Sequence, residues 1–265
     1  MAMFNKFSQL QLRERIMTNI RKRYCSFSLY QTFIRENNHL SAVRHSQTIE
    51  KICHLEGFNV VPFIKMILTW MMDFSFSNVQ FSVNTLYIVG GPETAAEALC
   101  NSIVSMFKCV STCDLNNFNY ELFKKTNEEI KFIFFPYMAN CIPFSDPMAN
   151  HVLRGREIQI VTENGPEVIQ PVKCLVHLKS LPPPHRIPTH NNQHAIIHFY
   201  EESDIDGIYP HDLISLMKAV SQAIGDVDME CKNPYRILCN KTEDDTIVCP
   251  NCRRGYDRYV HHPNV

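Results

Sequence analysis

A glycine pair at the end of a short apolar run is the first place where this sequence could do chemistry. Residues 85–89 form the run, two glycines end it, and a helical stretch follows. In this context, backbone N–H groups and a helix N-terminus can hold phosphates, while a Lys neutralises them and a Ser or Thr binds Mg²⁺. On the spacing G-x-x-x-x-G-K-[ST], the chain keeps Gly91 but has Ala96, Glu97 and Ala98 at the other positions. This single match is by itself more typical of a plain turn.

Four cysteines in the last part of the chain form a second candidate site. Cys249 and Cys252 enclose a proline and an asparagine, a spacing at which two thiolates can bind one zinc ion. Two further cysteines, or one of two histidines, could complete the site: Cys231, Cys239, His261 and His262. Zinc would give a fixed shape to a short polar tail. We therefore predict a structural zinc module; the alternative is four free thiols.

Histidines elsewhere in the chain could also suggest a metal site. Four of them follow one another at spacings of five, four and four residues: His185, His190, His194 and His198. They fall in a proline-rich loop and in the apolar segment that follows it. We expect them to be scattered surface histidines that bind no metal.

The pattern of apolar residues predicts the elements that would position these groups. Residues 1–75 are mostly helical in pattern, with two amphipathic runs separated at Gly57 and Asn59. From residue 84 the pattern changes to short apolar strands that alternate with helices, and Asn164-Gly165 predicts a hairpin. The predicted strands lie within residues 84–89, 108–113, 130–135, 171–178 and 194–200. This alternation predicts an α/β fold whose sheet is covered on both faces.

Composition narrows the classes of function. The net charge of −1 provides no chain-wide attraction to nucleic acid or to an anionic membrane. Residues 1–51 nevertheless hold nine Lys/Arg against three Asp/Glu, so they carry +6 and the rest of the chain carries −7. The longest apolar run is interrupted by Lys65 and Asp73, too soon to span a bilayer. We find no secretory signal, and several cysteines lie in apolar segments, so we expect an intracellular protein.

Residues 45–200 resemble the helicase domain of parvovirus replication (Rep-type) proteins, which are superfamily-3 helicases. The order of segments is similar: the helical pair EGFNVVPFIKMILTWM, a strand, GGPETAAEALCNSIV, and a Walker B-like strand about 40 residues on. The later segment LRGREIQIVTENGPEVIQPVKCLVHL resembles the family's DNA-contacting hairpin and sensor strand. Degenerate Rep-like open reading frames occur in avian adenoviruses, and this chain looks like such a copy.

The resemblance implies an AAA+-like P-loop sheet whose catalytic residues have been replaced. Tyr137 and Met138 fall at the Walker B carboxylates, Lys179 at the sensor Asn, and His194 near the arginine finger. The DNA-facing lysines of the hairpin fall at Glu157 and Glu163. At about 4 Å and an effective dielectric near 20, Glu97 in place of Lys removes about 4 kcal/mol of attraction to a triphosphate and adds a similar repulsion. We therefore expect neither ATP nor Mg²⁺ to bind, and no enzyme activity.

This interpretation divides the chain into three parts. Residues 1–78 would form a helical subdomain with a basic first helix, residues 79–225 the degenerate ATPase-like domain, and residues 226–265 the zinc module. We expect a non-enzymatic viral accessory protein of the host nucleus or cytoplasm that contacts host or viral proteins, with no membrane role. The resemblance also allows a homo-oligomer. The alternatives are a nucleic-acid-binding protein that uses the basic helix and zinc tail, an atypical ATPase, or an unrelated α/β domain.

Overall fold

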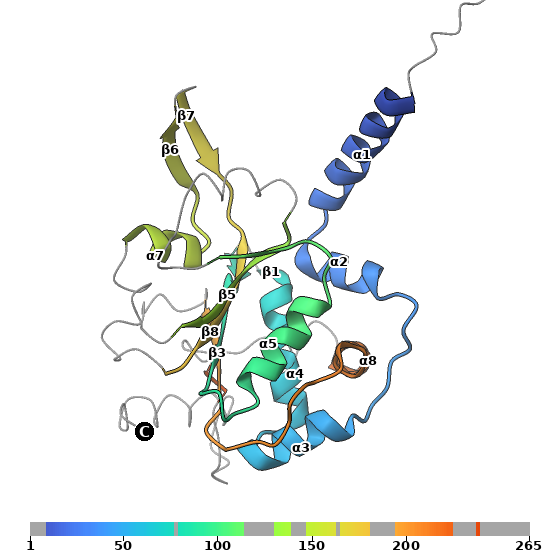
Figure 1. Ribbon diagram of the computed structural model, residues 1–265, viewed down its shortest axis with the longest axis vertical. Helices are drawn as coiled ribbons and strands as arrows, with labels where there is room; N and C mark the ends of the chain where they lie inside the picture. The colour runs from blue at the N-terminus through green and yellow to red at the C-terminus, as the bar shows by residue number, and fades with distance from the viewer. Residues whose placement is uncertain are drawn as a thin grey trace, which may run out of the picture.

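A six-stranded parallel sheet lies at the centre of the computed structural model (Figure 1). The structure describes residues 9–76, 79–113, 130–138, 147–162, 165–180, 194–224 and 237–238. The strand order is β10-β9-β3-β8-β5-β4, and every neighbouring pair is parallel. The strands are β3 (Thr85–Val89), β4 (Val110–Thr112), β5 (Phe132–Met138), β8 (Lys173–Leu178), β9 (His194–His198) and β10 (Ile237–Leu238). The predicted α/β sheet is therefore confirmed.

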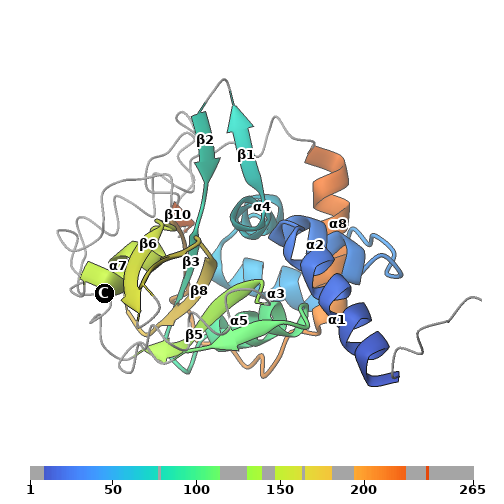
Figure 2. The ribbon, with the colours of Figure 1, turned by 90° about the horizontal axis from the view of Figure 1, so that it is seen from above.

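Helices cover both faces of this sheet. Among the described residues, one face packs against five helices and the other against one short helix, α7 (Figures 1 and 2). The larger layer contains α2 (Leu29–Glu36), α3 (Gln47–Glu56), α4 (Val60–Met71), α5 (Ala96–Ser105) and α8 (Pro210–Ile224). The smaller layer is α7 (Pro147–Leu153), whose Val152 and Leu153 are buried against the sheet. Residues alternate between the faces along each strand, so both faces are apolar.

The larger hydrophobic core is centred on the buried Trp70 of α4. Its ring packs edge-on against Phe132 of β5 at 5.3 Å between centroids, and Phe107 contacts the other side of Phe132 at 5.4 Å. The indole N–H donates a hydrogen bond to the Asn84 carbonyl at 3.1 Å, which satisfies its polar atom inside the core. Side chains from α2, α3 and α4 share this core with the sheet, so packing crosses the boundary predicted at residue 78.

The break between α3 and α4 lies where the sequence predicts it. Gly57 ends α3 in the left-handed region at φ 66°, a conformation that favours glycine. Asn59 then caps α4, because its side-chain oxygen accepts the N–H of Val61 at 3.0 Å. The predicted helical pair is therefore confirmed in both its elements and its turn.

Three elements extend from the body. They are α1 (Gln9–Cys25), the hairpin β1 (Asp73–Phe76) with β2 (Val79–Ser82), and the hairpin β6 (Ile158–Thr162) with β7 (Gly165–Ile169) (Figures 1 and 2). The hairpin β6–β7 was predicted, whereas β1–β2 was not. Glu157 lies exposed just before β6, and Glu163 lies outside the described residues. Within the described chain, no single helix is long and apolar enough to span a bilayer, although α3 and α4 pass that test together as a pair bent by 103°.

Candidate functional site

The candidate nucleotide positions meet at the carboxyl edge of the sheet. Val89 at the end of β3 and Met138 at the end of β5 both pair with Leu178, the last residue of β8. Because carboxyl ends of neighbouring parallel strands lie at one edge, Gly91, Tyr137 and Lys179 come together there. The structure thus brings together the positions that the resemblance assigns to nucleotide binding, with His194 as the exception.

The turn between β3 and α5 is closed by its own hydrogen bonds. Thr94, which is buried, donates from both its N–H (3.1 Å) and its hydroxyl (2.8 Å) to the Gly91 carbonyl. The same hydroxyl oxygen accepts the N–H of Ala96 at 3.3 Å. A Cβ on Gly90 would overlap the Thr94 side chain, so glycine is required by this close approach. The threonine side chain therefore occupies the interior of the turn.

Two carboxylates lie on this turn. The Glu93 carboxylate folds over Gly91 so closely that a Cβ on Gly91 would collide with it. Glu97 lies exposed in the first turn of α5, where the helix dipole favours a negative charge. No side chain caps α5, whose N-cap residue is Ala95. A phosphate approaching this turn would meet two like charges.

His177, which the sequence analysis did not single out, is the polar side chain at the centre of the edge. It is 1% exposed, and its Nε2 lies 3.3 Å from the Gly90 carbonyl oxygen. Since a carbonyl only accepts, Nε2 must carry the proton. Burial lowers the pKa of His177, against the opposing effects of the Gly90 carbonyl and Glu97, so the ring is neutral at pH 7. The sequence analysis placed Lys179 here, but Lys179 is exposed beyond the strand end.

Tyr137 lies at the position where the resemblance predicts a metal-binding carboxylate. Its ring packs against His177 at 5.1 Å between centroids, next to an irregularity in the β5–β8 pairing between Phe135 and Met138. A phenol does not supply the negative oxygens with which proteins usually hold Mg²⁺. The edge therefore presents a tyrosine, a neutral histidine and two glutamates.

His194 lies at the opposite edge of the sheet. It is the first residue of β9 and pairs with Thr85, the first residue of β3, roughly 15 Å from the carboxyl edge at about 3.3 Å per residue. The prediction that His194 and His198 are surface histidines is wrong, because β9 lies inside the sheet and buries both. The His194 ring packs 5.5 Å from that of Tyr87, and neither of its nitrogens has a hydrogen-bond partner within the part of the chain that the structure describes.

The predicted zinc ligands Cys231, Cys239, Cys249, Cys252, His261 and His262 lie outside the described residues. Among the residues that the structure describes, no three His, Cys, Asp or Glu side chains are grouped closely enough to hold a metal. Cys53, Cys100 and Cys174 are buried in the core, as the apolar segments around them predict. Burial raises the pKa of the Cys53 and Cys174 thiols to about 12, so these thiols are protonated at pH 7.

A search of curated proteins finds a relative in a fowl adenovirus. The chain is 34% identical over 208 residues to the uncharacterized protein ORF12 of Fowl adenovirus A serotype 1 (strain CELO / Phelps). The match covers 76% of this chain and 98% of the relative. No protein-family model matches the chain.

Solved structures give weaker likenesses. The A-form apo structure of the NrS-1 C-terminal region has a TM-score of 0.44 at 10% identity, over 69% of this chain and 47% of that one. A JCV helicase with a bound acetamide compound has a TM-score of 0.43 at 9% identity, over 83% of this chain and 69% of that one. The chain thus spans less than half of the NrS-1 chain.

Proposed function

Because the chain belongs to the family of the ORF12 protein of Fowl adenovirus A serotype 1, we propose that it is a viral accessory protein without ATPase activity. In this proposal, a sheet of the superfamily-3 helicase kind, derived from a parvovirus Rep-type domain, is kept as a scaffold that contacts host or viral proteins. The protein would act inside the host cell, in the nucleus or cytoplasm. One observation carries the proposal: the carboxyl edge presents Glu97, Tyr137 and His177 where a Lys, a carboxylate and an Asn would be needed.

The charges at the edge support a loss of nucleotide binding. Glu97 is exposed, so water screens its effect on a phosphate to about 1 kcal/mol at 4 Å. A Lys at position 97 would attract the phosphate by a similar amount. Replacing Glu97 by Lys would therefore change the binding free energy by about 2 kcal/mol, or roughly 30-fold in affinity. The Glu93 carboxylate over Gly91 adds a second repulsion at the turn itself. Hydrolysis would further need Mg²⁺, for which Tyr137 is a poor ligand.

The test measures ATP binding and Mg²⁺-dependent phosphate release by the purified full chain. We expect the wild type to bind ATP more weakly than about 1 mM and to release no phosphate. We expect the variant Glu97→Lys/Ala98→Thr to bind at least about 30-fold more tightly, still without turnover, because Tyr137 is unchanged.

A matched control separates the local effect from net charge. Glu157→Lys makes the same charge change on an exposed residue before β6, and we expect it to leave ATP binding unchanged. Micromolar ATP binding by the wild type, or any Mg²⁺-dependent hydrolysis, would show that the proposal is wrong.

A second candidate function is nucleic-acid binding through α1, favoured by the exposure of its basic side chains. Arg13, Arg15, Lys22 and Arg23 are all exposed on this helix. Binding through phosphates weakens steeply as salt rises, whereas a protein interface does so much less. A DNA-binding isotherm measured at several salt concentrations therefore distinguishes this candidate from the scaffold.

A further inference from the structure

Helix α1 carries aliphatic side chains that face solvent on successive turns. Leu12, Ile16 and Ile20, at spacings of four residues, are 53%, 49% and 55% exposed, and Met17 beside them is 43% exposed. Residues four apart lie on the same side of a helix, so these four side chains form one surface, the α1 stripe. Aliphatic surface that is continuous over several turns is typical of a site that contacts a partner.

The base of α1 is held to the body by specific contacts. The buried Lys131 amino group, at the start of β5, donates to the carbonyl of Tyr24 and, at 3.0 Å, to that of Phe27. The same amino group lies 4.3 Å from the centre of the Tyr24 ring, and the Arg35 guanidinium lies 3.8 Å over the ring of Phe27. From this base the helix points away from the sheet and the other helices (Figures 1 and 2), so the stripe remains accessible to a partner.

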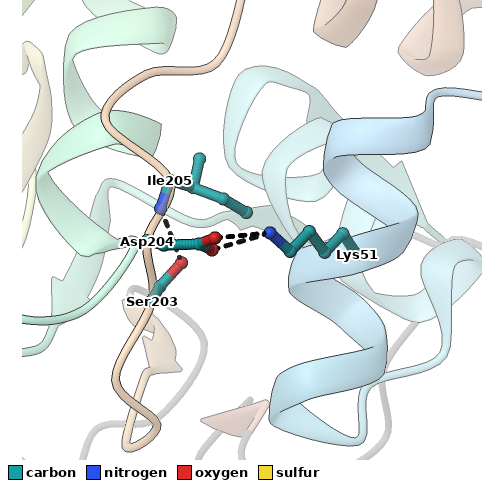
Figure 3. A network of polar contacts seen from close by, with 4 residues as sticks. All are labelled: Lys51, Ser203, Asp204 and Ile205. Carbon is teal, nitrogen blue, oxygen red and sulfur yellow. Dashed lines mark hydrogen bonds and ion pairs between the residues drawn. The ribbon is translucent and has the colours of Figure 1, made fainter.

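Positive charge is concentrated on the same helix. α1 holds five Arg or Lys residues and one Glu, a net charge of +4 (5 − 1), whereas the whole chain carries −1. Two lysines of the body are instead used in internal contacts. Lys51 pairs with both carboxylate oxygens of Asp204, at 2.7 and 2.9 Å (Figure 3), and Lys218 donates to two backbone carbonyls, at 2.5 and 2.7 Å. An anionic partner is therefore attracted to α1 although the chain as a whole is slightly negative.

The placement of two arginines restricts the kind of partner. At about 100° per residue around the helix axis, Arg13 and Arg23 point into the same angular range as the α1 stripe, one toward each end of the helix. A protein groove that covered the stripe would bury these charges too, and each would need its own carboxylate there. Nucleic-acid phosphates would contact the cations and leave the stripe in water. Neither partner uses both features of the helix.

An anionic lipid surface accommodates both features. The aliphatic side chains of such a helix enter the boundary between the headgroups and the acyl chains. Long Arg and Lys side chains can meanwhile keep their charges at the headgroups, without fixed partners, while their stems remain in apolar surroundings. Each Arg or Lys near an anionic membrane increases the partition coefficient by about fivefold. The charge and the stripe of α1 therefore act together only at this kind of surface.

We propose that α1 binds the surface of an anionic lipid membrane, with its stripe among the headgroups and its axis in the plane of the bilayer. The attachment is peripheral and needs no helix that spans the membrane. It goes beyond the proposed function, because α1 contains none of the nucleotide-site positions. It also revises the expectation of no membrane role, since the charge of the whole chain conceals the charge of this helix.

The test is co-sedimentation of the full chain with phosphatidylcholine vesicles prepared with and without phosphatidylserine. We expect the wild type to bind the vesicles that contain phosphatidylserine at least about tenfold more tightly than those without it. Hydrogen exchange measured by mass spectrometry then locates the contact. We expect amides of α1 to exchange more slowly in the presence of the anionic vesicles, and those of the central sheet to be unchanged.

The stripe is tested by Ile16→Gln/Ile20→Gln, which keeps good helix formers on exposed positions and should therefore fold. We expect this variant to bind anionic vesicles at least about tenfold more weakly than the wild type. Val161→Gln/Val168→Gln is the matched control, because it replaces two exposed valines of the β6–β7 hairpin. It should bind like the wild type.

The charge is tested by Arg13→Gln/Arg23→Gln. Removing two cations from the contact should weaken vesicle binding by about 30-fold. Lys108→Gln/Arg156→Gln removes two exposed cations outside α1 and should cost less than about threefold, because salt screens charges that lie away from the lipid.

Three outcomes would overturn the inference. The first is a wild type that does not bind anionic vesicles, or binds both kinds of vesicle equally. The second is Ile16→Gln/Ile20→Gln binding like the wild type, because the cations alone would then hold the protein, as they would on nucleic acid. The third is slower exchange in the body without any change in α1.

Discussion

At the scale of single residues, two buried histidines at opposite edges of the sheet have different environments. His177 donates to the Gly90 carbonyl and thereby fixes the turn before α5 against β8. His194 is 5% exposed and lies beside Tyr87, and no described residue forms a hydrogen bond with either of its ring nitrogens. Burying an unpaired polar ring costs free energy, and charging it would cost far more. Protonation of His194 in acid should therefore destabilise the folded protein.

The stability of the protein should decline in mild acid because of His194. Burial, with a smaller effect of Arg154, lowers the pKa of His194 from 6.5 to about 3. Between these values the unfolded chain binds a proton that the folded chain does not, so stability falls as pH falls through that window. For one such group, the free energy of unfolding changes by at most about 1.4 kcal/mol per pH unit. The measurement is urea unfolding followed by the fluorescence of Trp70. Between pH 6.5 and 5, we expect the free energy of unfolding to fall by about 2 kcal/mol less in His194→Phe than in the wild type.

The comparison for this measurement is His39→Phe, since His39 is exposed. We expect its pH dependence to follow that of the wild type. If wild type and His194→Phe declined in parallel, a lowered pKa of His194 in the folded protein would be excluded.

At the scale of elements, the α3–α4 pair is positioned by specific polar contacts as well as by its apolar side. The buried Glu56 carboxylate, near the end of α3, accepts the N–H of Tyr200 at 3.0 Å and that of Glu201 at 3.0 Å, just beyond β9. Charge-assisted bonds of this kind are the stronger ones in proteins. Gly57 then reverses the chain so that α4 can run back across the sheet. The turn is thus a defined element of the fold.

Replacing Gly57 by Ala should destabilise the protein by about 1 kcal/mol. A Cβ is disfavoured at φ 66°, and this strain is lost on unfolding. Gly207→Ala is the matched control, because a Cβ there would meet no atom within 4 Å. We expect it to change the free energy of unfolding by less than about 0.5 kcal/mol. Equal effects of the two substitutions in urea titrations would contradict a strained turn at Gly57.

At the scale of the whole molecule, one continuous core joins the helices before the sheet to those within and after it. Phe33 of α2, Trp70 of α4, Leu99 of α5 and Leu213 of α8 belong to the same cluster. The face with α7 is held separately: Asn84 Nδ2 donates to the carbonyls of Val152, Leu153 and Val172. The sheet is therefore the only structure that both clusters share, among the described residues.

The zinc module predicted for residues 226–265 remains a prediction. We expect the full chain, purified without chelator, to retain about one zinc ion, measured by atomic absorption. Cys249→Ser/Cys252→Ser should lose it, whereas Cys25→Ser, outside the tail, should keep it. Zinc retained in the double variant, or absent from the wild type, would contradict a site built on these cysteines.

The strands β3, β4, β5, β8 and β9 and the break between α3 and α4 could be predicted from the sequence, because apolar runs and turn residues encode local structure. The sequence also shows which residue types occupy the candidate nucleotide positions, because the presence of Glu97 where the motif has a Lys can be read from the sequence motif. It did not indicate α7, α8 or the hairpin β1–β2. Their formation depends on packing partners far along the chain.

Which side chains contact one another depends on how the strands are ordered and packed. The apolar segment from 171 to 178 predicts a strand, but the sheet order places His177 beside the Gly90 carbonyl and leaves Lys179 outside. The sequence predicts a strand at 194–200 and surface positions for His194 and His198, yet β9 lies between β10 and β3 and both histidines are buried. A groove of about 650 Å³ is lined by residues from the start of α3 and by residues 205–209. Burial and proximity depend on contacts between distant segments, so no local pattern contains them.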